Sequence, residues 1–150
     1  MVLGGSQGAR SINYAMPEAI KQLSSEMNIE VVHQTGEPDH EEICQIYKES
    51  EFSADIFPFI KDMAQAYEWA DLVVGRSGAM TVSELSAIGI PSILIPYPYA
   101  MDNHQLFNAR FLEEKKATVI IDDKKLNPEH LAEIIKKIAI YFLVIFLIKI

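Results

Sequence analysis

The sequence contains one cysteine and is short of positive charge. Cys44 has no second thiol with which to form an internal disulfide, which fits a reducing compartment. Its segment has a helical pattern, which favours a buried or half-buried thiol over a nucleophile. Lys and Arg number 13 against 21 Asp and Glu, so the net charge is -8. This balance disfavours a general nucleic-acid binder, because phosphate backbones reward clustered positive charge, but it leaves room for a local anion site built from backbone N–H groups.

The sequence also has no secretory signal at its start and no apolar run long enough to span a bilayer. Residues 1–5 read as the end of a strand entering a glycine turn, and a strand that begins at Met1 looks clipped. Residues 138–148 are eleven consecutive apolar residues, fewer than the ~20 that a membrane-spanning helix needs. This run is compatible with a buried helix, a sticky strand, a shallow membrane anchor or a broken reading frame.

Between these two ends, short segments rich in Val and Ile alternate with segments of helical length. A chain of 150 residues with 49% hydrophobic residues suits one globular domain. The alternation predicts an α/β fold: a Rossmann-like, mostly parallel sheet with helices on both faces. Ligands of such sheets bind at the carboxyl ends of the strands. After the opening strand, the pattern predicts strands at residues 29–33, 54–57, 72–74, 92–95 and 118–121, and helices at residues 11–25, 40–50, 62–70, 81–88, 103–115 and 128–137. Asn127 is the expected cap of the last of these helices.

Two glycine-bearing turns each follow a predicted strand and open a predicted helix. The first is residues 4–9, Gly-Gly-Ser-Gln-Gly-Ala, and the second is residues 75–84, Gly-Arg-Ser-Gly-Ala-Met-Thr-Val-Ser-Glu. Glycines let the backbone approach a ligand, and a helix N-terminus offers free N–H groups, so a phosphate or diphosphate is the expected guest. Neither turn has the Walker or the dinucleotide-binding spacing, and a plain strand-to-helix turn is the alternative for each.

Within the second turn, Ser77 or Thr81 is expected to cap the helix, and Glu84 is placed to accept hydrogen bonds from two ribose hydroxyls. The alternatives are charge compensation at the helix N-terminus for Glu84 and a surface ion pair for Arg76.

A third loop, residues 96–105, is stiffened by two prolines and leads into a helix that carries Asn108. Its polar side chains suit sugar hydroxyls and an acetamido group, and the alternative is a helix capped by Asp102. Residues 33–36, His-Gln-Thr-Gly, end the second strand. In the loop after the third strand, Phe59 or Ile60 could flank a flat base while backbone amides read its edge, although core packing is the expected role of Phe59. No cluster of His, Cys and carboxylates has metal-ligand spacing.

The two glycine turns, the His-Gln-Thr-Gly segment and the run from Asn103 to Asn108 resemble, in the same order, the C-terminal donor-binding half of the MurG family. These are bacterial transferases that move N-acetylglucosamine (GlcNAc) from UDP-GlcNAc in peptidoglycan synthesis. The resemblance covers residues 1 to about 137. It implies the C-terminal half of an inverting glycosyltransferase of the two-domain GT-B class, which needs no metal and no cofactor. The acceptor is undecaprenyl-pyrophosphoryl-MurNAc-pentapeptide (lipid I), and it binds an N-terminal domain at the cytoplasmic membrane face.

The resemblance also implies roles for particular residues. Ser6 and its neighbours hold the diphosphate, Ile60 meets the uracil, and Glu84 holds the ribose. Residues 79–83 lie along the phosphates and sugar, Arg76 stabilises charge near the diphosphate, and the third loop contacts GlcNAc. The expected substrate-binding residues are Gly5, Ser6, Gln7, Ile60, Arg76, Ala79, Met80, Thr81, Val82, Ser83, Glu84, His104, Gln105 and Asn108. No catalytic base is expected among them, because in this family the base belongs to the N-terminal half.

The expected organisation is a donor-binding domain at residues 1–137 and an apolar tail at residues 138–150. Family members end instead in an amphipathic helix that reaches back across the cleft, and a broken frame or truncated gene is the favoured explanation of the tail. Two alternatives to an enzyme half stay open: a UDP-sugar-binding subunit of a split glycosyltransferase, and a non-catalytic remnant.

Overall fold

The computed structural model describes residues 1–5, 8–50 and 52–148. Over these residues the chain forms one six-stranded sheet in the order β3-β2-β1-β4-β5-β6, and all neighbouring strands are parallel. The predicted α/β fold with a parallel sheet is therefore confirmed. The strands are β1 (Val2–Leu3), β2 (Val32–Gln34), β3 (Asp55–Phe57), β4 (Val73–Gly75), β5 (Ser92–Leu94) and β6 (Thr118–Ile120).

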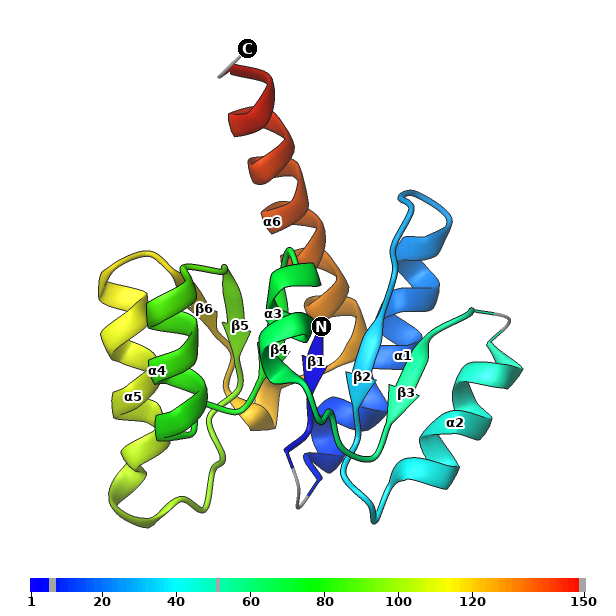
Figure 1. Ribbon diagram of the computed structural model, residues 1–150, viewed down its shortest axis with the longest axis horizontal. Coiled ribbons are helices and arrows are strands. Elements are labelled where there is room, and N and C mark those ends of the chain that lie inside the picture. Colours follow the sequence, from blue (N-terminus) through cyan, green and yellow to red (C-terminus); the bar gives the residue numbers. More distant parts are fainter. Residues whose placement is uncertain (6–7, 51, 149–150) are drawn as a thin grey trace.

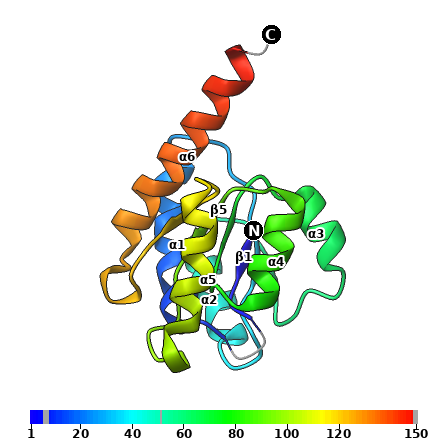
Figure 2. The same ribbon diagram turned by 90° about the vertical axis from the view of Figure 1, so that its left-hand side faces the viewer.

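Helices cover both faces of this sheet, as Figure 2 shows from one edge. The helices are α1 (Arg10–Ser24), α2 (His40–Glu49), α3 (Met63–Trp69), α4 (Ala79–Ile88), α5 (His104–Glu114) and α6 (Pro128–Ile148), with short 3-10 turns η1 (Met101–Asn103) and η2 (Asp123–Lys125). Most of these helices begin and end within two residues of the predicted bounds. The exception is α6, which continues through the apolar run.

The alternation of side chains along each strand produces two hydrophobic cores. One core joins Val2 and Val74 to the inner faces of α1 and α6, where Ile12 and Leu131 are fully buried. The other core joins Leu3 to α3, α4 and α5. Helix α6 starts with the predicted cap, since the Asn127 side-chain oxygen accepts a hydrogen bond from the His130 N–H at 2.8 Å.

Each helix returns antiparallel to its strand, so α6 begins near the carboxyl edge of the sheet and ends beyond the opposite edge. Figure 1 shows its distal half projecting past the body of the molecule. Ile140 and Tyr141, in the second half of α6, are 49% and 64% exposed. The apolar run is therefore a continuation of a helix rather than a strand. Among the described residues, no helix is long and apolar enough to cross a membrane.

Candidate functional site

The loops singled out in the sequence meet along one edge of the molecule. The carboxyl ends of the strands face the lower edge of Figure 1, where the loops after β1, β2, β3 and β5 lie. This is the edge at which parallel α/β sheets bind ligands.

The first glycine turn fits closely against the end of β2. The Gly4 N–H donates to the Gln34 carbonyl at 2.7 Å, and a Cβ on Gly4 would lie only 2.7 Å from that oxygen. Gly36 has a φ of +75°, and a Cβ there would lie 2.6 Å from the Gly8 nitrogen. Glycine is required at both positions because two backbones approach each other. Two predicted site residues of this turn, Ser6 and Gln7, lie outside the described residues.

A buried polar network supports this turn from the α1 side of the sheet. The Asn13 amide donates to the Thr35 carbonyl and to the Asp39 carboxylate, both at 2.8 Å. The Asn13 oxygen lies 3.1 Å from His33 Nε2, and the Tyr47 hydroxyl lies 3.1 Å from His33 Nδ1. Burial lowers the pKa of His33 to about 3, helped by the positive N-terminus, so the ring is neutral and Nε2 carries its proton toward Asn13.

Arg76, predicted to stabilise charge near the diphosphate, joins three loops through its guanidinium. Nη1 donates to the Ile95 carbonyl at 3.0 Å and to the Asp123 carboxylate at 2.6 Å, and Nη2 donates to the Ser11 hydroxyl at 3.0 Å. The side chains of Arg76 and Asp123 are each 18% exposed, so this is not the surface ion pair that was the alternative. The protein itself therefore holds the Arg76 guanidinium in place, and a ligand nearby would meet a charge that does not need to move.

The predicted cap of α4 is wrong. The N-cap is Gly78, and no side chain bonds to the free N–H groups there. The Ser77 hydroxyl instead donates to the Gln105 carbonyl at 2.8 Å, and the Asn108 amide donates to the Ser77 carbonyl at 3.1 Å. These bonds tie the second glycine turn to the first turn of α5 and leave the α4 N–H groups without a side-chain cap.

The predicted site residues 79–83 make up the first turn of α4. Met80 is 78% exposed, Ala79 and Ser83 are also exposed, Thr81 is half-buried and Val82 is buried. Val82 packs in the core beside Leu85, so its side chain is structural. At this position, a ligand would contact the backbone.

Glu84, one turn further along α4, accepts a hydrogen bond from the Tyr67 hydroxyl at 2.9 Å through its Oε2 atom. Burial and this bond raise the pKa of the Tyr67 hydroxyl, so it stays protonated and donates. The other carboxylate oxygen has no hydrogen-bond partner among the described residues. Glu84 is thus oriented by α3 and keeps one oxygen available to a ligand.

In the third loop, the side chains are already engaged with nearby backbone. His104 is exposed, with Nδ1 2.8 Å from the Met101 carbonyl, and Gln105 Oε1 accepts from the Tyr97 N–H at 2.9 Å. The alternative of a helix capped by Asp102 is wrong, because the N-cap is Asn103 and makes no side-chain cap bond. Both residues have positive φ, 52° and 53°, which produces a sharp turn into α5.

In the loop after β3, Ile60 is buried and its N–H donates to the side-chain oxygen of Gln34 at 2.9 Å. Phe59 is 59% exposed, so the expected core role of Phe59 is wrong. An apolar hollow of about 610 Å³ lies beside this loop, and its lining includes Phe57, Phe59, Ile60 and Trp69.

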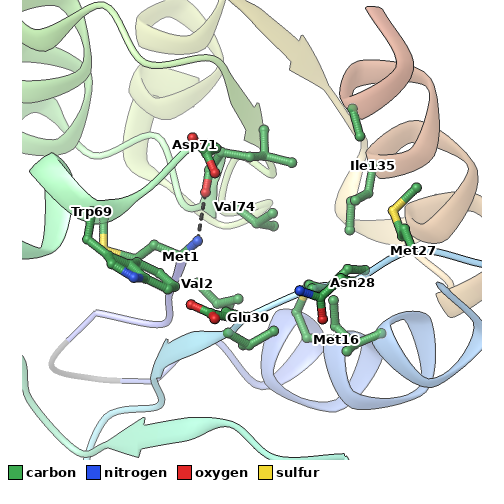
Figure 3. Close-up of a pocket in the computed structure, with 15 residues that line it drawn as sticks. Met1, Val2, Met16, Met27, Asn28, Glu30, Trp69, Asp71, Val74 and Ile135 are labelled. Atoms are coloured by element: carbon green, nitrogen blue, oxygen red, sulfur yellow. Dashed lines mark hydrogen bonds between the residues drawn. The ribbon is translucent and has the colours of Figure 1, made fainter. Parts of the chain in front are cut away.

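A second hollow of about 340 Å³ lies at the opposite edge of the sheet, and Figure 3 shows it. Met1, Trp69 and Asp71 line it, and the Met1 amine donates to the Leu72 carbonyl at 2.7 Å. Burial lowers the pKa of this amine to about 6, although Asp71 partly opposes the effect. None of the predicted ligand residues lines this hollow.

Sequence reasoning missed the residues that support the predicted contacts. Tyr67 and Asp123 gave no signal, because their partners lie 17 and 47 positions away in the sequence. Gln34 stood within the His-Gln-Thr-Gly segment but was given no role.

The fold defines a Rossmann-like α/β domain whose glycine turns lie at the carboxyl ends of its strands, the edge at which sheets of this kind bind ligands. Residues 1–140 match the glycosyltransferase family 28 C-terminal domain, and the chain belongs to this family.

Relatives carry the name UDP-N-acetylglucosamine--N-acetylmuramyl-(pentapeptide) pyrophosphoryl-undecaprenol N-acetylglucosamine transferase. One from Coxiella burnetii is 52% identical over 127 residues, which is 85% of this chain and 36% of the relative. Another from Thermodesulfovibrio yellowstonii is 52% identical over 139 residues, 92% of this chain and 38% of the relative. The crystal structure of Acinetobacter baumannii MurG matches with a TM-score of 0.84 and 36% identity, over 92% of this chain and 40% of that one. The fold is therefore that of the C-terminal GT-B half, and the chain spans little more than a third of these relatives.

Proposed function

We propose that this chain is the donor-binding half of an inverting glycosyltransferase that moves GlcNAc from UDP-GlcNAc to lipid I, giving lipid II. The observation that carries the proposal is the 52% identity to transferases of that name over 85% of the chain. The arrangement of loops at the carboxyl edge supports it, because two glycine turns and a carboxylate suit a sugar nucleotide.

In this proposal the backbone of the first glycine turn, with Gly5, Ser6 and Gln7, and the first turn of α4 hold the diphosphate. The departing UDP gains negative charge during transfer. Backbone N–H groups and helix N-termini that already point at the diphosphate stabilise this charge without reorganising. Arg76 adds positive charge from its fixed position between three loops.

The proposed contacts with the sugar and the base lie along the same carboxyl edge of the sheet. The unpartnered oxygen of Glu84 accepts from the ribose hydroxyls, and Ile60 lies against the uracil. His104, Gln105 and Asn108 face the GlcNAc. Because Gln105 and Asn108 also hold the loops in place, their contacts with the sugar use atoms not engaged in those bonds.

The acceptor and the general base belong, in this proposal, to an N-terminal domain of the kind found in the longer relatives. The complete enzyme then works as a peripheral protein at the cytoplasmic face of the bacterial plasma membrane. The 150-residue chain by itself is expected to bind the donor and not to transfer the sugar, and turnover of a lipid I analogue by the isolated chain would contradict this.

Calorimetric titration of the chain with UDP-GlcNAc tests the proposal. Glu84→Ala should weaken binding at least tenfold, since hydrogen bonds to a charged group contribute about 1.5–3 kcal/mol. Glu114→Ala is the matched control, because Glu114 is an exposed carboxylate at the end of α5. Absence of binding by the folded chain, or equal losses in the two variants, would refute the donor assignment.

A further inference from the structure

Ser11 and Asp123 both bind Arg76, although the proposed function assigns neither of them a role. Ser11 is the second residue of α1, and Asp123 opens η2, just before α6. The Ser11 hydroxyl donates to Asp123 Oδ1 at 2.6 Å and accepts from Arg76 Nη2 at 3.0 Å. Arg76 Nη1 donates to the same Asp123 oxygen at 2.6 Å. The three side chains therefore form a closed ring of hydrogen bonds.

This ring lies where the chain leaves two neighbouring strands for opposite faces of the sheet. At the carboxyl ends of β1 and β4, Leu3 pairs with Gly75. Beyond this pair the chain enters α1 on one face and α4 on the other (Figure 2), an arrangement that opens a crevice for a ligand. Neither helix is capped by a side chain, since its N-cap is an alanine or a glycine. The bond from Arg76 to Ser11 thus joins the α4 side of the crevice to the α1 side.

The ring holds the Arg76 guanidinium in place and still leaves part of it available. An arginine side chain has five N–H groups. The bonds to Ser11, Asp123 and the Ile95 carbonyl use those on Nη1 and Nη2. The Nε–H group has no hydrogen-bond partner among the described residues. An anion in the crevice can therefore bind a guanidinium that is already ordered, which lowers the entropic cost of binding.

We infer that Ser11 and Asp123 are positioning residues: by fixing Arg76 between α1 and α4, they make the crevice prefer a nucleoside diphosphate to the corresponding monophosphate. A diphosphate can reach both helix N-termini and the guanidinium between them, whereas a monophosphate reaches fewer of these groups. The inference rests on the proposed function, because it takes the crevice to be the diphosphate site. Both residues act through Arg76, so neither is a catalytic residue.

Titration calorimetry of the unaltered chain with UDP and UMP tests the inference without any mutation. The two ligands share the base and the ribose, so the ratio of their dissociation constants isolates the second phosphate. UDP should bind at least about tenfold more tightly than UMP, because hydrogen bonds between charged groups are the strong ones. Equal affinities for the two ligands would overturn the inference.

Ser11→Ala removes the hydroxyl that joins Arg76 to α1. It should reduce the preference for UDP over UMP about fivefold, as expected for the loss of one hydrogen bond, and change the affinity for UMP less. Ser11→Thr keeps a hydroxyl and should retain most of the preference. The matched control is Ser50→Ala, which removes another partly buried serine bond, to the Tyr47 carbonyl at the end of α2. This control should leave the ratio unchanged.

Asp123→Ala distinguishes positioning from simple charge compensation. If Asp123 only offset the charge of Arg76, its removal would raise the preference for UDP, which carries more negative charge than UMP. If it positions the guanidinium, the preference should fall about fivefold, because Arg76 and Ser11 lose the acceptor that they share. We expect the fall, and a rise would overturn the inference.

The outcomes separate the two proposals. If the unaltered chain binds neither UDP nor UDP-GlcNAc, the proposed function fails and the inference fails with it. If UDP binds and a folded Ser11→Ala variant keeps the full preference over UMP, only the inference is overturned. If one of the two alanine variants does not fold, the other decides, and if neither folds, Ser11→Thr and the titrations of the unaltered chain decide.

Discussion

Tyr67 has a buried ring, and its hydroxyl reaches Glu84 on the neighbouring helix at 2.9 Å. That bond fixes one carboxylate oxygen, and in the proposed function the other oxygen accepts from the ribose hydroxyls. Tyr67→Phe should therefore weaken UDP binding about fivefold, the loss of about 1 kcal/mol expected for one hydrogen bond. The same substitution should weaken binding of 2′-deoxy-UDP less than binding of UDP. This ligand lacks one of the two ribose hydroxyls that donate to Glu84 in the proposed site.

The matched control is Tyr47→Phe, which removes another buried tyrosine hydroxyl, the one bonded to His33. It should lower stability without changing the ratio of UDP to 2′-deoxy-UDP affinity. Titration calorimetry on both variants gives this ratio. Equal losses for the two ligands in Tyr67→Phe would mean that the tyrosine serves only the fold.

His33 makes stability depend on pH, because its folded pKa of about 3 lies well below the 6.5 of an unfolded histidine. Between these values the unfolded chain binds more protons, so stability is complete above about pH 6.5 and falls as the pH decreases. The loss approaches about 1.4 kcal/mol per pH unit, or about 2 kcal/mol from pH 6 to pH 4.5.

Urea unfolding of the chain and of His33→Gln at both pH values checks this expectation. The variant has no imidazole to protonate, so the acid-induced loss should be smaller in it by about 2 kcal/mol. The measurements are made at pH 6 and below because the buried Met1 amine, whose pKa is lowered to about 6, also makes the fold less stable as the pH falls from 8 to 6. Identical pH dependence in the two proteins would show that His33 is not buried as a neutral ring.

At the scale of elements, the alternation of strands and helices could be predicted from the sequence, because the spacing of apolar residues and the residues that form turns are local signals. The cap of α6 at Asn127 is such a signal, and it was predicted correctly. The cap of α4 was predicted wrongly because Ser77 bonds to Gln105, 28 positions away. The strand order and the joining of three loops by Arg76 depend on the same kind of distant contact, which no local pattern contains.

Helix α6 has two halves with different expected sensitivity to substitution. Leu131 is fully buried against α1, whereas Ile140 is half exposed on the projecting part. Leu131→Ala should cost about 2–5 kcal/mol of unfolding free energy through lost burial and a cavity, and Ile140→Ala should cost less than about 1 kcal/mol. Urea unfolding compares the two, and similar costs would show that the projecting half is packed in solution.

At the scale of the whole molecule, the projecting helix and the proposed donor site lie at opposite edges of the sheet (Figure 1). The donor loops follow the carboxyl ends of the strands, and α6 ends beyond their amino ends. The division into a domain at residues 1–137 and a tail at residues 138–150 stays a prediction, and this separation offers a way to test it.

A chain that ends after residue 141 keeps the buried residues of α6, including Leu131, Ala132 and Ile135. Since none of the proposed ligand contacts lies on the removed part, its dissociation constant for UDP-GlcNAc should stay within about twofold of the full chain, and its urea midpoint should change little. Glu84→Ala in the shortened chain should weaken binding as much as in the full one, which shows that the same site is measured. Loss of donor binding on shortening, with folding retained, would show that the apolar run contributes to the site across the width of the sheet.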